Sequence, residues 1–463
     1  MKTNHILKKL LVVLVWLFIW QILYICVDSD LLFAGPAQTV QVLFSMMTDV
    51  QFYGVVLSSL VNVLSGFCLA FVTGIMLAAA SSCSRYIREL LTPFFAMLKS
   101  VPVASFVILA LLWIGSRRLS ILVAFVVSLP IIYTGILTAI TKTDNKILEM
   151  THIFRFSVHS RVCAVYIPQI SPFIISSGKL AIGMSFKAGV AAEVIACSAG
   201  SIGERLYMAK IYFQTGELFA WTAVIVLLSY LSELMFELLT SLLIKLLTSD
   251  VYSLGRLRKT IKKPAKLRLS IKNVSKLYGK MQVLDDISLE VTGPEIIAIT
   301  GDSGKGKTTL LNIIMGLCRC DSGAVDVEGG ITAVFQEQRL IEDCSALANV
   351  SYSIYNNSSE YDSRAAVKES VSEVLAGVLP SDCLNKKVKL LSGGERRRVE
   401  IVRALLGDSG ICLFDEPFTG LDEANKQKMI RLIKQCSEGR IFVFAVHDKE
   451  SLDALNVEKE IKL

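Results

Sequence analysis

Six apolar segments lie in the first 250 residues, and each is close to the length that crosses a lipid bilayer. A membrane-spanning helix needs about 20 mostly apolar residues. The segments are approximately 10–27, 56–80, 94–114, 119–141, 170–197 and 217–245. Apolar residues make up 53% of the chain and charged residues 19%, which is too apolar for an average soluble protein and too charged for a chain wholly within the membrane. We therefore expect a polytopic α-helical membrane domain at 1–250, followed by a soluble domain.

The first apolar segment has the basic start that a signal peptide also has. Its core, LLVVLVWLFIWQILYICV, is too long for a typical signal peptide, and no small-x-small cleavage site follows it. We interpret it as a membrane anchor.

Basic residues gather in alternate loops, and such loops face the cytoplasm. They are Lys2, Lys8, Lys9, Arg85, Arg88, Lys142, Lys146, Arg155 and Arg161. Arg117 and Arg118, between the third and fourth segments, are an exception. The majority predicts a multi-pass protein with both termini and the soluble domain in the cytoplasm.

The fifth segment contains three ionisable residues, Lys179, Lys187 and Glu193. Charges that face lipid are costly, so these side chains should face the bundle interior, a partner subunit or water. The two lysines would lie about 80° apart around a helix. They are candidates for a substrate path, with lysine snorkelling or a Lys–Glu pair that only fixes packing as the alternatives.

A basic linker is expected at 251–268, because Tyr252–Ser270 contains seven basic residues and no acidic one. Directly after a membrane segment, attraction to anionic lipid headgroups explains it more simply than nucleic acid. The 11 cysteines include no C-x-x-C pair, so we interpret them as reduced and structural.

The second half of the chain contains a predicted phosphate-binding loop. Two strand-like runs, ISLEV and IIAIT, precede GDSGKGKTT, whose Gly301–Thr308 fits the G-x-x-x-x-G-K-[ST] pattern. Backbone N–H groups of such a loop wrap phosphate oxygens, and the following helix start favours the anion. Lys307 would reach the β- and γ-phosphates, and Thr308 would hold Mg²⁺. The other candidate ATP contacts in the loop are Gly301, Ser303, Gly304, Gly306 and Thr309.

Two carboxylates end a later apolar run, ICLFDEP, at Ile411–Pro417. Asp415 suits Mg²⁺ contact, directly or through water, and Glu416 suits polarisation of the attacking water. Phosphoryl transfer depends mainly on positioning and charge neutralisation, which these groups supply.

LSGGERRRVEIVRAL, beginning at Leu391, resembles the signature of the ATP-binding cassette (ABC) ATPases. The resemblance covers 269–463 and implies an α/β P-loop ATPase that uses ATP and Mg²⁺. It implies these further roles: Tyr278 stacks on adenine, Gln336 of the Q-loop senses Mg²⁺, Asp422 ends the D-loop, and His447 contacts the γ-phosphate. Glu395 stands where the family often has glutamine.

The family arrangement implies a dimer, because the signature of one ATPase faces the P-loop of another. Ser392, Gly393 and Gly394 would then complete the ATP site of a partner. With one membrane domain and one ATPase domain, the chain resembles a half-transporter, and a homodimer is the simplest assembly.

The loop Thr143–Tyr166 resembles the cytoplasmic coupling loop of binding-protein-dependent permeases, whose pattern is Glu-Ala-Ala, Gly and then hydrophobic-x-x-Pro. Glu149 and Pro168 fit this spacing, while Met150 and Thr151 stand at the alanines and no glycine follows. Glu149, Phe154 and Phe156 are therefore candidate coupling residues.

VPVASFVILALLWIG and GKLAIGMSFKAGVAAEVIA resemble the permeases of sulfonate, taurine and nitrate importers, a group that includes transporters of pyrimidine vitamin precursors. The resemblance implies a type I importer fold in a prokaryotic cytoplasmic membrane, with a separate extracytoplasmic substrate-binding protein. Fusion of permease and ATPase in one chain departs from that group.

Two other functions fit a membrane domain followed by an ATPase. An exporter half-transporter would carry long polar helical extensions between spans, and the loop after the second segment is only about a dozen residues. An ATP-driven signalling device would be expected to carry a large extracytoplasmic domain, and the predicted outer loops are short.

Overall fold

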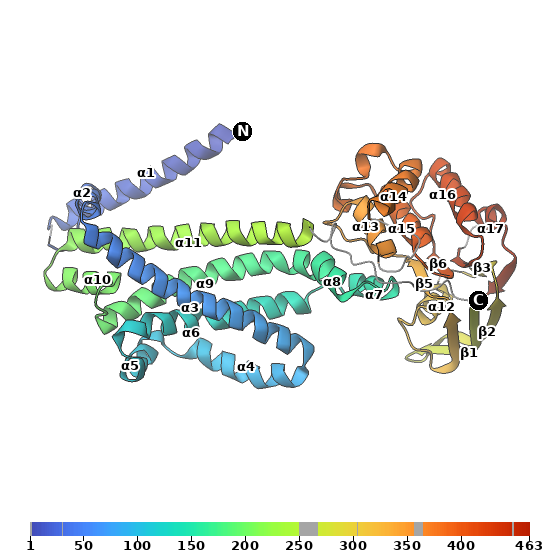
Figure 1. The fold of residues 1–463 in the computed structure, drawn as a ribbon, viewed down its shortest axis with the longest axis horizontal. Helices are drawn as coiled ribbons and strands as arrows, with labels where there is room; N and C mark the ends of the chain where they lie inside the picture. Colours follow the sequence, from blue (N-terminus) through green and yellow to red (C-terminus); the bar gives the residue numbers. More distant parts are fainter. Residues whose placement is uncertain (1, 30, 250–266, 303, 356–363, 447–448) are drawn as a thin grey trace. The chain divides into compact units, whose positions relative to one another are not determined.

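The computed structural model describes residues 2–29, 31–249, 267–302, 304–355, 364–446 and 449–463. The described chain divides into two compact units (Figure 1). The first comprises Met1–Thr143 and Gln169–Ile244, and the second comprises Asp144–Pro168 and Lys245–Leu463. The predicted linker at 251–268 lies almost wholly outside the described residues.

The first unit is helical. Its helices are α1 (Lys2–Val27), α2 (Pro36–Met47), α3 (Val50–Cys83), α4 (Arg85–Ser100), α5 (Val103–Ile114), α6 (Ser116–Thr141), α9 (Ile167–Ala196), α10 (Ile202–Ile211) and α11 (Thr215–Ser249). Figure 1 shows α3, α6, α9 and α11 running alongside one another. Their apolar composition favours this, because a helix that is apolar all round is stable only inside a core or a membrane.

Small residues let these helices approach closely, as expected for membrane helix packing. A Cβ added at Gly189 of α9 would lie 2.9 Å from Val63 of α3. One added at Gly178 would collide with the ring of Phe236 on α11. The buried core between the helices includes Phe67, Ala124, Ile132, Ala181 and Phe186.

Three helices of the described chain, α3, α6 and α11, are long and apolar enough to cross a membrane. A fourth span is present if α4 and α5, which meet at 101°, are counted as one broken span. The segment predicted as a span at 94–114 is not one straight helix. Pro102 is the N-cap of α5 and the chain turns there, because proline restricts the residue before it and removes a backbone donor. Leu11–Val27 is a shorter apolar stretch of α1. The six-span topology therefore stays a prediction.

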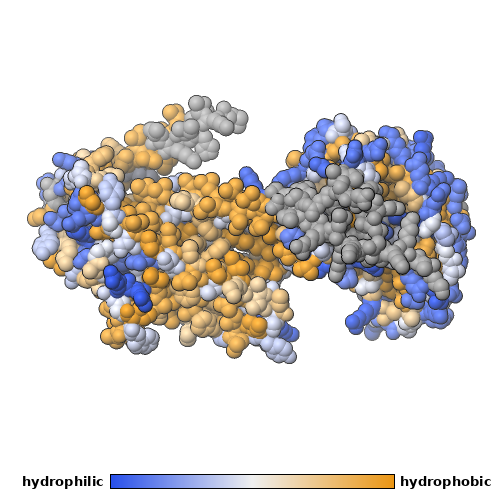
Figure 2. Space-filling view, in the orientation of Figure 1, coloured by the Kyte–Doolittle hydropathy of each residue, from blue (hydrophilic) through white to orange (hydrophobic). Residues whose placement is uncertain are grey.

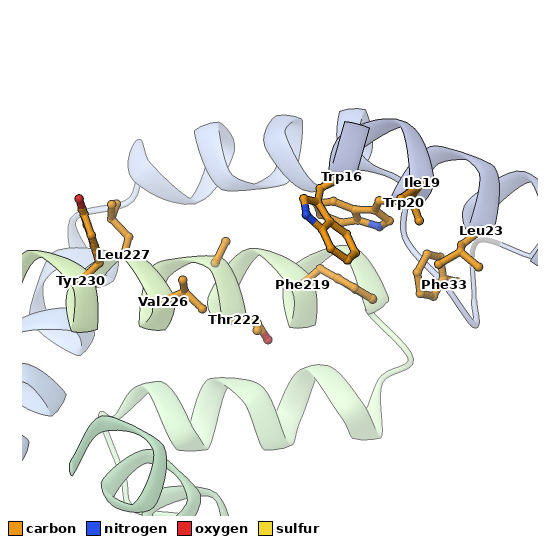
Figure 3. Close-up of a pocket in the computed structure, with 11 residues that line it drawn as sticks. Trp16, Ile19, Trp20, Leu23, Phe33, Phe219, Thr222, Val226, Leu227 and Tyr230 are labelled. Carbon is orange, nitrogen blue, oxygen red and sulfur yellow. The ribbon is translucent and has the colours of Figure 1, made fainter. Parts of the chain in front are cut away.

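The visible face of the first unit is mostly apolar, with hydrophilic patches toward one end. Hydrophilic side chains are frequent on the coloured part of the second unit's visible face (Figure 2). Between α1 and α11 lies a groove of about 600 Å³ lined by aromatic and aliphatic side chains (Figure 3). Trp20 lines this groove and donates a 3.0 Å hydrogen bond from Nε1 to the carbonyl of Ala34. Such a surface suits contact with hydrocarbon rather than water.

The second unit is an α/β domain. Its strands are β1 (Arg268–Tyr278), β2 (Met281–Thr292), β3 (Glu295–Thr300), β4 (Ser322–Glu328), β5 (Ile331–Val334), β6 (Ile411–Asp415), β7 (Ile441–Ala445) and β8 (Lys459–Lys462). Its helices are α7 (Asn145–Ile153), α8 (Val158–Arg161), η1 (Val162–Tyr166), α12 (Lys307–Ile314), α13 (Ala346–Tyr355), α14 (Arg364–Val378), η3 (Ser381–Cys383), η4 (Val388–Leu390), α15 (Gly393–Leu406), α16 (Glu423–Cys436) and α17 (Lys449–Leu455).

Two sheets organise the described part of this unit. One is antiparallel in the order β2-β1-β4, and the other is parallel in the order β5-β6-β7-β3-β8. The parallel strands β3, β6 and β7 are almost wholly buried, as expected for continuous apolar runs. Because the strands are parallel, their carboxyl ends meet at one edge, and ligands of such sheets bind there.

Candidate nucleotide site and the segment docked beside it

The glycine loop that follows β3 adopts a conformation that only glycine tolerates well. Gly301, Gly304 and Gly306 have φ values of 150°, 85° and 93°. The loop leads into α12, whose first residue is Lys307. The Lys307 ammonium donates to the carbonyls of Gly301 at 2.6 Å and Asp302 at 3.0 Å, so it lies across the mouth of the loop. This loop offers backbone donors and one cation to an anion.

Gly306→Ala is expected to disable this loop. The new Cβ would lie 2.8 Å from Val283 Cγ1 and 2.9 Å from the Val283 carbonyl, at a positive φ. We expect the free energy of unfolding to fall by about 2–4 kcal/mol. We also expect ATP binding to be lost. Gly439→Ala is the matched control, because Gly439 also has positive φ but no atom within 4 Å. Thermal unfolding and ATP titration should separate the two; equal effects would show that backbone strain alone matters.

Three oxygen-bearing side chains predicted as Mg²⁺ ligands lie together beside α12. Thr308 Oγ1 lies 3.4 Å from Gln336 Oε1, and Thr308 also hydrogen-bonds Asp415. Burial raises the pKa of Asp415 above its ordinary value, so a cation beside it would stabilise the carboxylate. Hydroxyl, amide and carboxylate oxygens are the donors that Mg²⁺ prefers. One carboxylate suffices because nucleotide phosphates would supply further ligands; the described residues contain no cluster of three His, Cys, Asp or Glu side chains.

Glu416, which follows β6, has an unusual backbone. Its φ is 46°, in the left-handed region, and its N–H donates to the Ala445 carbonyl of β7 at 2.9 Å. Its side chain lines a cavity of about 410 Å³ together with Phe418, Thr419 and Glu423. A non-glycine residue held in this region marks a place where structure over-determines the backbone.

The signature residues begin α15. Ser392 is the N-cap: its hydroxyl accepts from Glu395 N at 3.3 Å, and its own N–H donates to Glu395 Oε2 at 2.8 Å. This capping box uses the carboxylate of Glu395 as an acceptor, and the hydrogen bond from the Ser392 backbone lowers the pKa of Glu395. A Cβ at Gly393 would meet nothing within 4 Å, so this surface is open.

Two further predicted nucleotide residues, Tyr278 and Asp422, lie among the described residues. Tyr278 is half exposed, with its hydroxyl 3.7 Å from Cys318 Sγ, and it also contacts Thr309. Asp422 caps α16 by accepting from Asn425 N at 2.8 Å. Ser303 and His447 lie outside the described residues.

Asp144–Pro168, named here the docking segment, belongs to the second compact unit, which holds the two sheets, and not to the helical unit. Glu149 forms a 2.6 Å ion pair with Arg339, three residues after Gln336. Lys146 forms a second ion pair with Glu337, which lowers the pKa of that carboxyl. Both pairs therefore join the docking segment to the Q-loop.

The two phenylalanines of the docking segment are buried against the same unit. Phe154 is 1% exposed, and the guanidinium of Arg403 lies 4.7 Å from its ring centroid. Burial lowers the pKa of Arg403 to about 10, so it remains charged at neutral pH and can attract the ring face. Phe156 lies 5.9 Å from the ring of Tyr352 on α13.

The ionisable residues of the fifth apolar segment do not share one cluster. Lys179 pairs with Glu237 of α11 at 2.7 Å. Glu193 is buried and accepts from Ser59 at 2.8 Å and from Gly203 N at 3.3 Å. Lys187 is exposed. No ion pair or hydrogen bond found among the described residues joins two of these three. Their role in a substrate path stays a proposal.

Sequence reasoning missed several charged residues around the docking segment. Lys146 was considered only as a basic loop residue, and Glu337, Arg339 and Arg403 were not singled out. For Arg403 a signal exists in the motif RRRVEIVR, which places Arg397, Glu400 and Arg403 at spacings of three on α15. Residues three apart share one face of a helix, but only the packed structure shows that this face is buried.

Both units match known protein families. Residues 284–419 match the family described as ABC transporter, and residues 70–248 match the binding-protein-dependent transport system inner membrane component. The chain thus carries a segment similar to an inner membrane transport component, followed by a segment similar to the ATP-binding part of ABC transporters.

The relatives described next match about 40% of the chain. The chain is 35% identical over 209 residues to the sulfate/thiosulfate import ATP-binding protein CysA of Bacillus cereus, covering 42% of this chain and 58% of that protein. It is 33% identical over 198 residues to CysA of Escherichia coli (strain K12), covering 40% of this chain and 54% of that protein. The chain thus spans little more than half the length of these relatives. A solved dimeric structure of the ATP-binding cassette MJ0796 is 30% identical, covers 42% of this chain and 94% of that chain, and has a TM-score of 0.39.

Proposed function

We propose that the chain is one half of an ATP-driven importer that moves a small solute across the cytoplasmic membrane of a prokaryote. The observation that carries this proposal is the docking segment, which leaves one membrane helix, α6, inserts Phe154 and Phe156 into the ATPase unit, and returns into α9. A hydrolytic domain bound so tightly to a loop between membrane helices has a mechanical route to them.

The proposed chemistry uses the residues at the carboxyl edge of the parallel sheet. The P-loop backbone and Lys307 hold the phosphates, with Tyr278 and Thr309 nearby. Glu416 orients and polarises the attacking water, and His447 contacts the γ-phosphate. Thr308, Gln336 and Asp415 would hold Mg²⁺, which neutralises developing charge on the phosphates.

The proposed assembly is a homodimer. The open surface at Ser392 and Gly393 supports it, because the family resemblance places a partner's ATP against these residues. Asp422 and Gly394 would lie at the same interface. A separate extracytoplasmic binding protein delivers solute, membrane lipid surrounds the helices, and no nucleic acid is involved. Nucleotide closure then opens the membrane cavity outward, and hydrolysis resets it inward.

Ser392→Ala tests the dimer. In mixed dimers with one mutant subunit, the wild-type partner's ATP site should lose hydrolysis, because that site borrows Ser392 in trans. Removing this N-cap also costs about 1 kcal/mol. Ser437→Ala, at a helix end remote from the motifs, is the control. To tell the two ATP sites apart, Lys307→Ala is added either to the Ser392→Ala chain or to its wild-type partner. Loss restricted to the mutant subunit's own site would contradict the trans arrangement.

We propose an organic or inorganic anion such as a sulfonate, taurine or nitrate, or a pyrimidine vitamin precursor, as the solute. The membrane-segment resemblance supports this group, and the relatives of the ATPase are sulfate/thiosulfate import proteins by name. The direct test is to titrate the cognate binding protein with these compounds. The loaded protein should then stimulate ATP hydrolysis by the purified chain in lipid nanodiscs, and absence of stimulation by any loaded form would reject import.

A further inference from the structure

A buried ion pair on α15 lies directly behind the backbone of Glu416. Arg397 is 2% exposed and Glu400 is fully buried, and Arg397 Nη1 lies 3.0 Å from Glu400 Oε2. A buried charge pair is costly to desolvate, and replacing such a pair by apolar residues is often neutral for stability. Stability alone therefore does not account for this buried pair.

The contacts of Arg397 converge on the backbone around Glu416. Nη2 donates to the carbonyls of Asp415 at 2.8 Å and Glu416 at 2.7 Å, and Nε donates to Pro417 at 3.1 Å. Nη1 donates to the carbonyl of Phe335 as well as to Glu400. All five donors of the guanidinium are therefore used. Three of them hold three consecutive carbonyls, which fixes the path of the chain through Glu416.

Glu400 fixes the guanidinium in turn. One carboxylate oxygen accepts from Arg397, and the other accepts from the backbone N–H of Arg339 at 2.6 Å. Arg339 is the residue that pairs with Glu149 of the docking segment. The same carboxylate thus anchors both Arg397 and the Q-loop.

We propose that Arg397, held by Glu400, is the positioning residue that keeps Glu416 in its left-handed conformation and aims its carboxylate into the cavity. This rests on the proposed role of Glu416 in hydrolysis. A planar, five-donor group suits this task, and a lysine ammonium with three donors on a flexible stem cannot reproduce it.

The test is a double-mutant cycle on the full-length protein in lipid nanodiscs, with Mg-ATP as substrate. Arg397→Lys keeps the positive charge beside Glu400 but loses the planar guanidinium and its five donors. We expect kcat to fall about 10- to 100-fold, with the Kd for ATP within about threefold. In the Glu416→Gln background the same change should lower the residual rate less than about twofold, because the group that it positions is already missing.

Arg396→Lys is the matched control. Arg396 neighbours Arg397 on α15, but its guanidinium donates to Leu391 and Lys389 instead. Its kcat should stay near wild type. If Arg397→Lys fails to fold, Glu400→Gln, which keeps the side-chain shape, should show the same non-additivity with Glu416→Gln.

The proposal would be overturned if Arg397→Lys lowered the rate by the same factor in the wild-type and Glu416→Gln backgrounds. It would also be overturned if ATP binding and melting temperature fell in parallel. Wild-type kcat in Arg397→Lys would overturn it as well. The proposed function is tested separately, because it requires Glu416→Gln alone to lower kcat at least about 100-fold.

Discussion

Glu416→Gln is expected to stop ATP turnover while leaving ATP binding intact. Glu416 lines the cavity of about 410 Å³, and its carboxylate is the group proposed to polarise the attacking water. General-base groups contribute about 10²- to 10⁴-fold, so kcat should fall at least 100-fold. Glutamine meets the same backbone requirement at φ 46° as glutamate, so the melting temperature should hold. The measurements are phosphate release and ATP titration.

Glu423→Gln is the matched control, because Glu423 lines the same cavity from the first turn of α16. It should hydrolyse ATP within about twofold of wild type, since surface substitutions away from special features have small effects. Undiminished phosphate release by Glu416→Gln would remove Glu416 from the mechanism.

Phe154→Ala is expected to separate ATP hydrolysis from solute uptake. The ring fills a buried site over Arg403, and deleting a buried Phe side chain costs about 3–5 kcal/mol. It also leaves a buried guanidinium whose Nε and Nη2 already have no hydrogen-bond partner among the described residues. Weakened docking should lower uptake more than tenfold, while basal hydrolysis persists.

Val158→Ala supplies the control within the same segment, because Val158 is 76% exposed. Uptake into proteoliposomes and phosphate release should be measured on the same preparation. Normal uptake by Phe154→Ala would place the coupling contact elsewhere. Loss of both activities together with a lowered melting temperature would show that Phe154 supports folding rather than coupling.

The sequence anticipated the ATPase core well because its signals are local. The strands predicted at ISLEV, IIAIT and ICLFD lie in β2, β3 and β6. The P-loop, Gln336 and Glu416 follow the buried strands β3, β5 and β6, and parallel strands bring their carboxyl ends to one edge. Gly306 illustrates why this works: its positive φ and its tight contact with Val283 leave room only for glycine.

The helical half was harder to predict, because the length of an apolar segment does not show where the chain bends. The stretch 94–114 is mostly apolar, yet the chain turns by 101° between α4 and α5. Nor does composition predict that Lys179 pairs with Glu237, 58 residues away. Similarly, Arg397 and Glu400 look like ordinary helix charges until packing buries them against Glu416.

The central claim is that ATP hydrolysis drives solute toward the side of the membrane that holds the ATPase domain. Its most direct measurement uses proteoliposomes with ATP on one side, and labelled solute with its binding protein on the other. We predict ATP-dependent movement of solute to the ATP side, abolished by Glu416→Gln. Movement away from the ATP side, or hydrolysis without any movement, would contradict import.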